Sequence, residues 1–265
     1  MIPAIDLRWE RPSRYHRAMA PGVRLLKRLI DIAGSSAGIA LTWPLMIPIA
    51  AAIRLDSPGP IFFVQRRCGP LIDDPPDAIP PDHRRGHRWT AFDIYKFRTM
   101  GVDAERGTGA VLATKGDARV TRVGAFLRKT RLDELPQFWN VLRGDMSLVG
   151  PRPERPELLE TLAMAIPYFE ERTRGVKPGL TGLAQISLGY SGNASPDSDA
   201  GKVFASLANP FGMDEAEGAV ADDMRNKLMF DLAYAASLES FWSYVQMEIA
   251  ILVKTPMIMV LSRGH

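Results

Sequence analysis

Two adjacent carboxylates, Asp133 and Glu134, lie in the stretch "RKTRLDELPQFWNVLRGDMSLVGPRP", residues 128–153. An ionised carboxylate can act as a nucleophile, or it can bind Mg²⁺, which prefers oxygen ligands and keeps several of its waters. An Asp-Glu pair at a helix start can also simply stabilise the positive end of the helix dipole. The residue types and spacing therefore leave two interpretations, a catalytic pair and a helix cap.

Positive charges near this pair favour the catalytic interpretation. The candidate phosphate-binding residues are Lys96, Arg98, Arg128 and Arg152. A guanidinium group binds phosphate oxygens in a bidentate manner, and lysine supplies a point charge. Arg152 lies between two prolines in "GPRP", which restrict its backbone. Such a set can stabilise a phosphoryl transfer largely by position and charge.

The pair has to be positioned by a helix. Pro136 is tolerated in a first turn, so the helix is expected to begin near residues 132–135 and to end at Gly144. Thr130, three residues before Asp133, resembles an N-terminal cap. Helical spacing predicts two faces. The apolar face comprises Leu132, Leu135, Trp139 and Leu142, and the polar face, which we expect to turn toward a site, comprises Asp133, Gln137 and Asn140.

Several other chemistries lack support in the sequence. The single cysteine, Cys68, excludes a disulfide framework and a cysteine-based zinc site. The four histidines lie in terminal or proline-rich segments, so neither a histidine metal site nor a Ser-His-Asp triad is expected. No Walker sequence and no GxGxxG turn is present. The net charge of +3 and the pI near 9.1 do not choose between nucleic acid, anionic lipid and phosphorylated small molecules.

Residues 32–53 contain no charged side chain and would reach about 33 Å as a straight helix, enough to cross a bilayer core. Basic residues flank the segment on both sides, whereas a single crossing usually shows a bias to one side. Pro44 and Pro48 are expected to bend the helix. We therefore expect a re-entrant helix-break-helix, with Lys27, Arg28 and Asp31 at headgroup level. A true span, a buried core helix and a signal sequence are the alternatives.

The rest of the chain predicts an α+β fold that is mostly helical. Residues 61–65 and 90–100 are expected to form a small β-hairpin. Residues 156–176 predict an amphipathic helix kinked near Pro167, and residues 177–187 a loop. The helices toward the C-terminus end in an apolar run that carries Glu248, Lys254 and Pro256, which favours an interfacial helix over a second span.

These observations divide the chain into three parts. Residues 1–23 form a basic N-terminal tail, expected to contact an anionic cytoplasmic leaflet. Residues 24–56 form the re-entrant hairpin. Residues 57–265 form a cytosol-facing catalytic domain, with loop insertions near 70–88 and 189–222.

From residue 24 to about 260 the chain resembles the bacterial sugar transferases, the monotopic phosphoglycosyl transferases. The resemblance rests on ordered blocks: "KRLIDIAG", "DSPGPIFFVQRRCG", "FDIYKFRTM", "LRKTRLDELPQFWNVLRGDMSLVGPRPE", "RGVKPGLTGLAQIS" and "KLMFDLAY". It implies a short-form member, monotopic on the cytoplasmic face of the bacterial inner membrane. One departure is Trp43, which stands before Pro44 where the family often has serine.

The resemblance also implies an activity. Such enzymes transfer a sugar 1-phosphate from a nucleotide diphosphate sugar, here expected to be a UDP-sugar, to polyprenyl (undecaprenyl) phosphate and release UMP. This is the first membrane step of a glycan pathway. The implied mechanism is ping-pong through a phosphosugar intermediate on Asp133, which is also a Mg²⁺ ligand, with Glu134 as its partner. The resemblance assigns phosphate handling to Lys96, Arg128 and Arg152, and the membrane bend to Pro44.

Two further function classes remain as alternatives. A non-catalytic membrane scaffold that binds nucleotide sugars or polyprenyl phosphate would use the same cations without needing the carboxylates. A module for anionic lipid or nucleic acid would bind with a steep dependence on salt. The compact clustering of the motifs argues against the latter, and no nucleic-acid partner is expected. A homodimer is compatible with the sequence.

Overall fold

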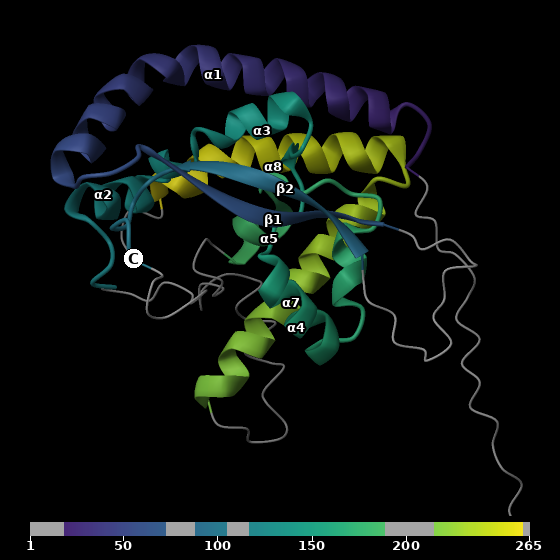
Figure 1. Ribbon diagram of the computed structural model, residues 1–265. Coiled ribbons are helices and arrows are strands. Elements are labelled where there is room, and N and C mark those ends of the chain that lie inside the picture. The colour runs from purple at the N-terminus through teal and green to yellow at the C-terminus, as the bar shows by residue number, and fades with distance from the viewer. Residues whose placement is uncertain (1–18, 73–87, 105–116, 189–214, 262–265) are drawn as a thin grey trace, which may run out of the picture.

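A computed structural model describes residues 19–72, 88–104, 117–188 and 215–261. The four histidines, most of the basic tail and most of both expected loop insertions lie outside these ranges. The described chain is mostly helical, with two small two-stranded sheets. Figure 1 shows the long first helix arching over the molecule, with α8 below it and α4 and α7 on the far side of the β-hairpin.

The first helix, α1 (Val23–Asp56), runs without interruption through Pro44 and Pro48. The expected break is therefore wrong, although the helix is visibly curved (Figure 1). A proline removes one backbone donor and bends a helix, but the hydrogen bonds on either side can continue. Thr42 Oγ1 donates to the carbonyl of Gly38 at 2.7 Å, a side-chain contact that also favours bending.

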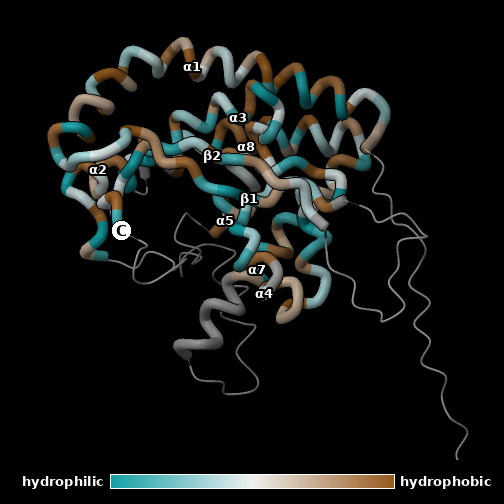
Figure 2. Tube along the Cα trace, in the orientation of Figure 1, coloured by the Kyte–Doolittle hydropathy of each residue, from teal (hydrophilic) through white to brown (hydrophobic). Residues whose placement is uncertain are grey.

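Along part of its length α1 has the reverse of the polarity of a helix on a water-soluble protein, although it also buries Val23, Ile49 and Ile53. Its exposed large apolar residues are Leu25, Leu29, Ile32, Leu41, Trp43, Leu45, Ile47 and Leu55. Its buried positions include Lys27, Asp31 and Ser35, spaced four residues apart on one face. Figure 2 shows the alternation of hydrophobic and hydrophilic residues along this helix. By length and composition α1 could cross a membrane.

Lys27 and Asp31 do not lie at an outer surface, contrary to expectation, because the protein encloses both. The ammonium of Lys27 donates to the Val149 carbonyl at 2.9 Å, the Tyr234 hydroxyl at 2.7 Å and the Glu248 carboxylate at 3.0 Å. These partners come from three other elements. The buried charge is thus compensated within the protein, as a buried ion requires.

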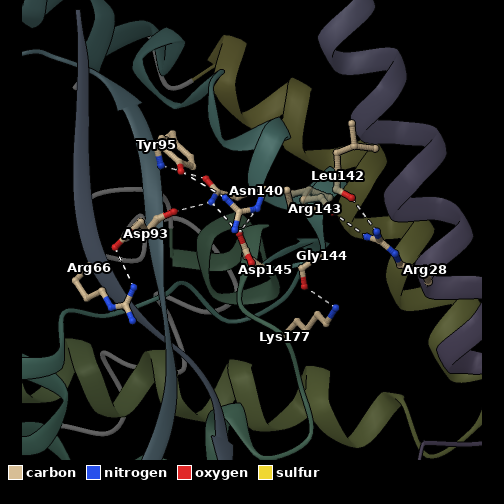
Figure 3. A network of polar contacts seen from close by, with 11 residues as sticks. Arg28, Arg66, Asp93, Tyr95, Asn140, Leu142, Arg143, Gly144, Asp145 and Lys177 are labelled. Carbon is tan, nitrogen blue, oxygen red and sulfur yellow. Dashed lines mark hydrogen bonds and ion pairs between the residues drawn. The ribbon is translucent and has the colours of Figure 1, made fainter. Parts of the chain in front are cut away.

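Asp31 and Arg28 of α1 form hydrogen bonds with residues 141–148, which follow the Asp133–Glu134 pair in the chain. Asp31 Oδ1 accepts bonds of 2.8 Å from the Ser147 hydroxyl and the Leu148 backbone N–H. Arg28, which is half-buried, donates to the carbonyls of Val141 and Leu142 at 2.9 and 2.8 Å. Figure 3 shows the contact between Arg28 and Leu142. The side of α1 that faces the protein therefore fixes the end of the helix that follows Asp133 and Glu134.

Close packing also requires small residues on α1. A Cβ atom added at Gly38 would lie 2.8 Å from the ring of Phe138, and one added at Gly34 would lie 2.5 Å from Leu148. Both distances are far shorter than a normal contact between carbon atoms. These two glycines let the body of the protein approach the helix.

The expected β-hairpin is confirmed. Strands β1 (Phe62–Ile72) and β2 (Arg88–Phe97) pair in an antiparallel manner, with Phe63 opposite Lys96 and Arg67 opposite Phe92. Strand β1 extends further than the predicted residues 61–65, whereas β2 begins before and ends before the predicted residues 90–100. A register irregularity lies between Cys68 and Leu71. The pairing places the side chains of Lys96 and Arg67 on the same face of the hairpin.

A second, very short sheet was not predicted. Strands β3 (Ser147–Val149) and β4 (Gly179–Thr181) pair in parallel. A Cβ atom at Gly150 would lie 2.3 Å from the Lys177 carbonyl, and one at Gly179 would lie 2.1 Å from the Gly150 nitrogen. Only glycine permits this backbone approach. The pairing fixes the chain where it enters the "GPRP" segment.

The remaining helices are α2 (Arg122–Thr130), η1 (Leu132–Glu134), α3 (Gln137–Arg143), α4 (Pro156–Ala165), η2 (Phe169–Thr173), α5 (Leu183–Leu188), α7 (Glu215–Ser237) and α8 (Phe241–Leu261). The predicted kinked helix over 156–176 ends at Ala165, and η2 follows it. Because Pro167 has no N–H, the helix cannot simply continue. The predicted loop over 177–187 contains β4 and most of α5. The main hydrophobic cluster joins Val23 of α1 with residues of α3, β3, α7 and α8.

Candidate active site

The carboxylate pair lies in η1, at a break between two helices. Helix α2 ends at Arg131, whose backbone is left-handed at φ 59°. Pro136 is then the N-cap position of α3. The prediction that Thr130 caps the helix of the pair is wrong. Its hydroxyl instead donates back to the Phe126 carbonyl within α2 at 2.9 Å. The predicted stop at Gly144 is confirmed, with φ 93°.

This break changes which residues of α3 face inward. Trp139, predicted for the apolar face, is exposed. Phe138 and Val141 pack against the core instead. The prediction counted one continuous helix from residue 132, whereas the chain forms a tighter 3₁₀ turn before α3, so the phase of the pattern shifts.

Asn140 has a structural role rather than the predicted role of facing a site. It is fully buried, and its Oδ1 accepts the Tyr95 N–H at 3.1 Å. Its Nδ2 donates to the Asp93 carbonyl at 2.7 Å and to the Asp145 carboxylate at 3.4 Å. Figure 3 shows Asn140 between these groups. The residue fixes α3 against the edge of β2.

Two cations hold Glu134. Its Oε1 accepts bonds from Lys96 Nζ at 3.1 Å and from Arg152 Nη2 at 2.7 Å. Burial opposes a charge on this carboxyl, but the positive charges of Arg152 and Lys96 outweigh burial and hold its pKa well below its usual range. Glu134 is therefore ionised at neutral pH. Burial lowers the pKa of Lys96, and the charge of Glu134 opposes that change.

Asp133 is buried like its neighbour but is held differently. Among the residues that the structure describes, its Oδ1 has no hydrogen-bond partner. Burial raises the pKa of Asp133, and the negative charge of Glu134 raises it further, while Lys96 opposes both effects. A carboxylate in this state lacks a compensating group on one oxygen, which is a costly arrangement unless a ligand provides one.

The backbone around Arg152 is held from two sides. Arg172 Nη2 donates to the Arg152 carbonyl at 2.8 Å, and Arg67 Nη1 donates to the Pro153 carbonyl at 3.0 Å. The next carbonyl, of Glu154, accepts the Cys68 N–H at 3.0 Å. Bonds to three consecutive carbonyls hold the backbone from which the Arg152 side chain extends.

Arg172 is itself fully buried and forms an ion pair of 2.9 Å with Asp231 of α7. Burial raises the pKa of Asp231 to about 6, although Arg172 opposes this. Neither Arg67 nor Arg172 was predicted from the sequence to be a functional residue. Each stands in a charged run, "QRR" or "EERTR", in which nothing local distinguishes a buried arginine from exposed neighbours.

The structure does not bring all the predicted cations to the pair. Arg128 Nε donates to the Thr99 hydroxyl at 3.0 Å. Arg98 donates to the carbonyls of Ser57 and Pro58 at 2.8 and 2.6 Å, just past the end of α1. Lys96 and Arg152 thus meet at Glu134, whereas the recorded contacts of Arg98 and Arg128 are to other protein groups. Trp43 and Pro44, the predicted bend residues, lie within α1.

The donor set fits a Mg²⁺ ion that needs few protein ligands. Within the described ranges, no group of three or more histidine, cysteine, aspartate or glutamate side chains could hold a metal ion. Asp133 offers an unpartnered carboxylate oxygen, and Glu134 is already bound to cations. Mg²⁺ is commonly held by one or two carboxylates together with waters and substrate phosphates. Asp133 is therefore the candidate ligand.

A cavity of about 270 Å³ lies beside the pair. Its charged lining residues are Arg131 and Glu134. The rest is mainly apolar and is lined by Leu135, Phe138, Leu148, Leu180, Thr181, Leu252, Thr255 and Pro256. These residues come from η1, α3, the β3–β4 sheet and α8, so the cavity joins the charged site to the helices that pack under α1.

The candidate site is thus a buried, charged pair of carboxylates in a chain whose first helix exposes an apolar surface. The family model described as bacterial sugar transferase matches residues 22–262. The chain belongs to this family. The match includes α1 as well as both carboxylates.

Several relatives are similar to part of the chain. A UDP-N-acetylgalactosamine-undecaprenyl-phosphate N-acetylgalactosaminephosphotransferase of Aeromonas hydrophila is 43% identical over 66% of this chain and 37% of its own length. A putative undecaprenyl-phosphate N-acetylgalactosaminyl 1-phosphate transferase of Bacillus subtilis is 44% identical over 56% of this chain and 72% of its own. A UDP-glucose:undecaprenyl-phosphate glucose-1-phosphate transferase of Escherichia coli is 43% identical over 62% of this chain and 31% of its own. The chain thus spans about a third of the first and third of these relatives.

Proposed function

We propose that the protein transfers a sugar 1-phosphate from a UDP-sugar to polyprenyl phosphate and releases UMP. The observation that carries this proposal is the asymmetry of the carboxylate pair. Glu134 is bound by Lys96 and Arg152, while the adjacent Asp133 keeps a buried oxygen without a partner. The names of the relatives support the same reaction class.

In the first step, an oxygen of the Asp133 carboxylate attacks the phosphorus that carries the sugar. A bond forms between this oxygen and phosphorus, and the bond from phosphorus to the bridging oxygen of the diphosphate breaks. UMP leaves with that oxygen and its electron pair. The product on the protein is an acyl phosphate that joins the sugar phosphate to Asp133, the kind of intermediate that carboxylate nucleophiles form.

In the second step, an oxygen of polyprenyl phosphate attacks the same phosphorus. The bond between phosphorus and the Asp133 oxygen breaks, which restores the carboxylate and yields a polyprenyl-diphosphate-linked sugar. No proton has to be removed from either attacking group when both are ionised. Each step has its own nucleophile, first Asp133 and then polyprenyl phosphate, and UMP leaves before the acceptor reacts, which is a ping-pong mechanism.

The cations have separate parts in this proposal. Lys96 and Arg152 lie within bonding distance of one carboxylate, so a diphosphate at Asp133 could share their charge. Arg128 would reach phosphate by giving up its contact with Thr99. We propose Arg98 as a support for the end of α1, because its guanidinium is bound to carbonyls there. Mg²⁺ held through Asp133 would supply neutralisation of the diphosphate charge.

We also propose that α1 enters and leaves one leaflet of the cytoplasmic membrane from the cytosolic side. Basic residues at both ends and the curvature of the helix support a re-entrant course. The exposed residues Trp242, Ile249, Val253 and Met257 give α8 an apolar stripe that suits an interfacial position. The apolar cavity next to Glu134 suits the first isoprene units of the acceptor.

The experiment compares the native protein with Asp133→Asn in membranes. We would measure UMP release from a panel of UDP-sugars with polyprenyl phosphate present, and would trap labelled sugar phosphate on the denatured chain. The native protein should release UMP and retain label, and Asp133→Asn should do neither. Turnover by Asp133→Asn at the native rate would contradict a mechanism in which Asp133 is the nucleophile. Retained binding but no turnover by either protein would favour a non-catalytic scaffold.

A further inference from the structure

Gln137 carries a second buried polar atom that lacks a partner. It is the first residue of α3, and its side chain is 2% exposed. In the part of the chain that the structure describes, its Nε2 has no hydrogen-bond acceptor. A buried amide donor without an acceptor is destabilising, and such groups in native proteins usually have a reason.

Gln137 lies close to Asp133 along the chain, across the turn that joins η1 to α3. The two are four residues apart, and the intervening Leu135 and Pro136 have right-handed helical backbone angles. Within α3, Gln137 and Asn140 are three residues apart and so lie on the same side of the helix. The bonds of Asn140 to Asp93 and Tyr95 hold this side of α3 against β2. This side therefore packs toward the strand that supplies Lys96.

The two unpartnered atoms are chemically complementary to the proposed substrate. The oxygen of Asp133 is an acceptor that suits a cation or an electrophilic phosphorus, whereas Nε2 of Gln137 is a donor that suits a phosphate oxygen. The amide of Asn140, one turn further on, finds its acceptors within the protein. Two neighbouring amides on one helix thus differ in whether the fold itself satisfies them.

We propose that Gln137 is a phosphate-binding residue of the transferase. Its Nε2 donates to a non-bridging oxygen of the phosphorus that Asp133 attacks, both in the bound donor and in the phosphosugar intermediate. The bond orients the phosphorus toward the carboxylate and stabilises the charge that develops on its oxygens in the transfer. This inference rests on the proposed function, because it assigns a role within the same site.

A substitution that removes the donor and keeps the size tests this assignment. Gln137→Met fills the same space without a polar group, and Asn140→Leu is the matched control, since it removes an amide that the fold uses. We would measure thermal unfolding, kcat and KM for the donor, and the fraction of chain that carries labelled sugar phosphate. Gln137→Met should lower kcat by about 100-fold, as expected for loss of one donor to a developing oxyanion. It should leave Tm unchanged or raise it, whereas Asn140→Leu should lower Tm.

Gln137→Glu separates a donor from an acceptor. The carboxylate keeps the size and polarity but repels phosphate, so its activity should fall at least as far as that of Gln137→Met. Turnover within threefold of native by either variant would overturn the proposal. A fall in Tm for Gln137→Met as large as that of Asn140→Leu would also overturn it, because the amide would then have a partner in the protein.

The native protein in the same assay keeps this inference separate from the proposed function. If the native protein neither releases UMP nor takes up label from any donor, both fall together. If the native protein is active and Gln137→Met is equally active, the proposed function stands and only the role of Gln137 is lost.

Discussion

Lys27 of α1 and Glu248 of α8 form an ion pair of 3.0 Å in which both side chains are almost completely enclosed. The Tyr234 hydroxyl oxygen lies 2.9 Å from the Glu248 carboxylate and 3.1 Å from the Val149 carbonyl, and either can accept its hydrogen. The pair therefore connects the exposed apolar helix to β3, only a few residues before Arg152. Such a buried pair is costly to break from one side, because the remaining charge is left without compensation.

Removing Lys27 should destabilise the whole protein. Lys27→Met leaves Glu248 buried without its cation, and we expect the free energy of unfolding to fall by about 3–5 kcal/mol. Denaturant unfolding in detergent would measure the change. Arg24→Met is the matched control, since Arg24 is exposed on the same helix. Equal denaturant midpoints for Lys27→Met and Arg24→Met would contradict a structural role for the ion pair. Combining Lys27→Met with Glu248→Leu should recover part of the lost free energy of unfolding.

Glu134→Gln should reduce turnover without removing the nucleophile. The variant loses the charge that holds Lys96 and Arg152 together, so both cations become less well placed for phosphate. We expect kcat to fall by about 100-fold, within the range for a positioned acid–base or electrostatic group. Labelling of the chain by sugar phosphate should persist at a lower rate. Complete loss of labelling would instead assign Glu134 a direct part in bond formation.

The pH dependence of turnover should report Asp133. Burial and the charge of Glu134 raise its pKa, and the nucleophile has to be ionised, so kcat should fall with acid at a higher pH than an ordinary aspartate would give. Glu134→Gln removes one cause of the raised pKa, so its acid limb should move to lower pH. A limb that moves upward in this variant would contradict the electrostatic account.

Asp231 should make the stability of the protein depend on pH. Its pKa is raised to about 6 in the folded state, above the value of about 3.9 for an unfolded chain. The folded state then binds more protons between these values, so this carboxyl's contribution is fully present below about pH 4 and is lost as pH rises through 6. The unfolding free energy of the native protein should fall relative to Asp231→Asn across this window, by at most about 1.4 kcal/mol per pH unit. Parallel curves for the two proteins would refute it.

The two ends of α1 should face the same side of the membrane. Leu25→Cys and Leu55→Cys place thiols at exposed positions near each end, in a Cys68→Ser background. An impermeant maleimide should label both from the cytosolic side and neither from the other side. Labelling of the two positions from opposite sides would establish a single crossing in place of the re-entrant course.

Much of the site could be predicted because its signals are local. The Asp133–Glu134 pair, the stop at Gly144 and the hairpin are each encoded by neighbouring residues, and Lys96 and Arg152 were candidates by residue type before the family pattern assigned them phosphate handling. The phase of α3 could not be predicted, because it depends on the left-handed turn at Arg131 and the 3₁₀ turn after it. The sequence pattern consequently assigned Asn140 to a face turned toward a site, whereas its side chain binds the backbone of β2.

The inner face of α1 was hidden for a different reason. Lys27 is separated from its partners Val149 and Glu248 by 122 and 221 residues. Local patterning marks a charge at the edge of an apolar run as a surface charge, because that is the usual way to hydrate it. Only the three-dimensional arrangement shows that a carboxylate and a carbonyl from distant segments bind the Lys27 ammonium in place of water. The same holds for Arg172, whose partner Asp231 lies 59 residues away.

The reversed polarity of α1 constrains how the protein is made. When α1 leaves the ribosome, Lys27 and Asp31 have neither β3 nor α8 to receive them, because both are synthesised later. An isolated α1 entering lipid at that moment would bring two bare charges with it, which is unfavourable. Stable seating of the helix therefore has to wait until the C-terminal helix exists. Biogenesis should proceed after translation, with folding of the body and capture by the bilayer as one coupled event rather than through insertion of a leading segment.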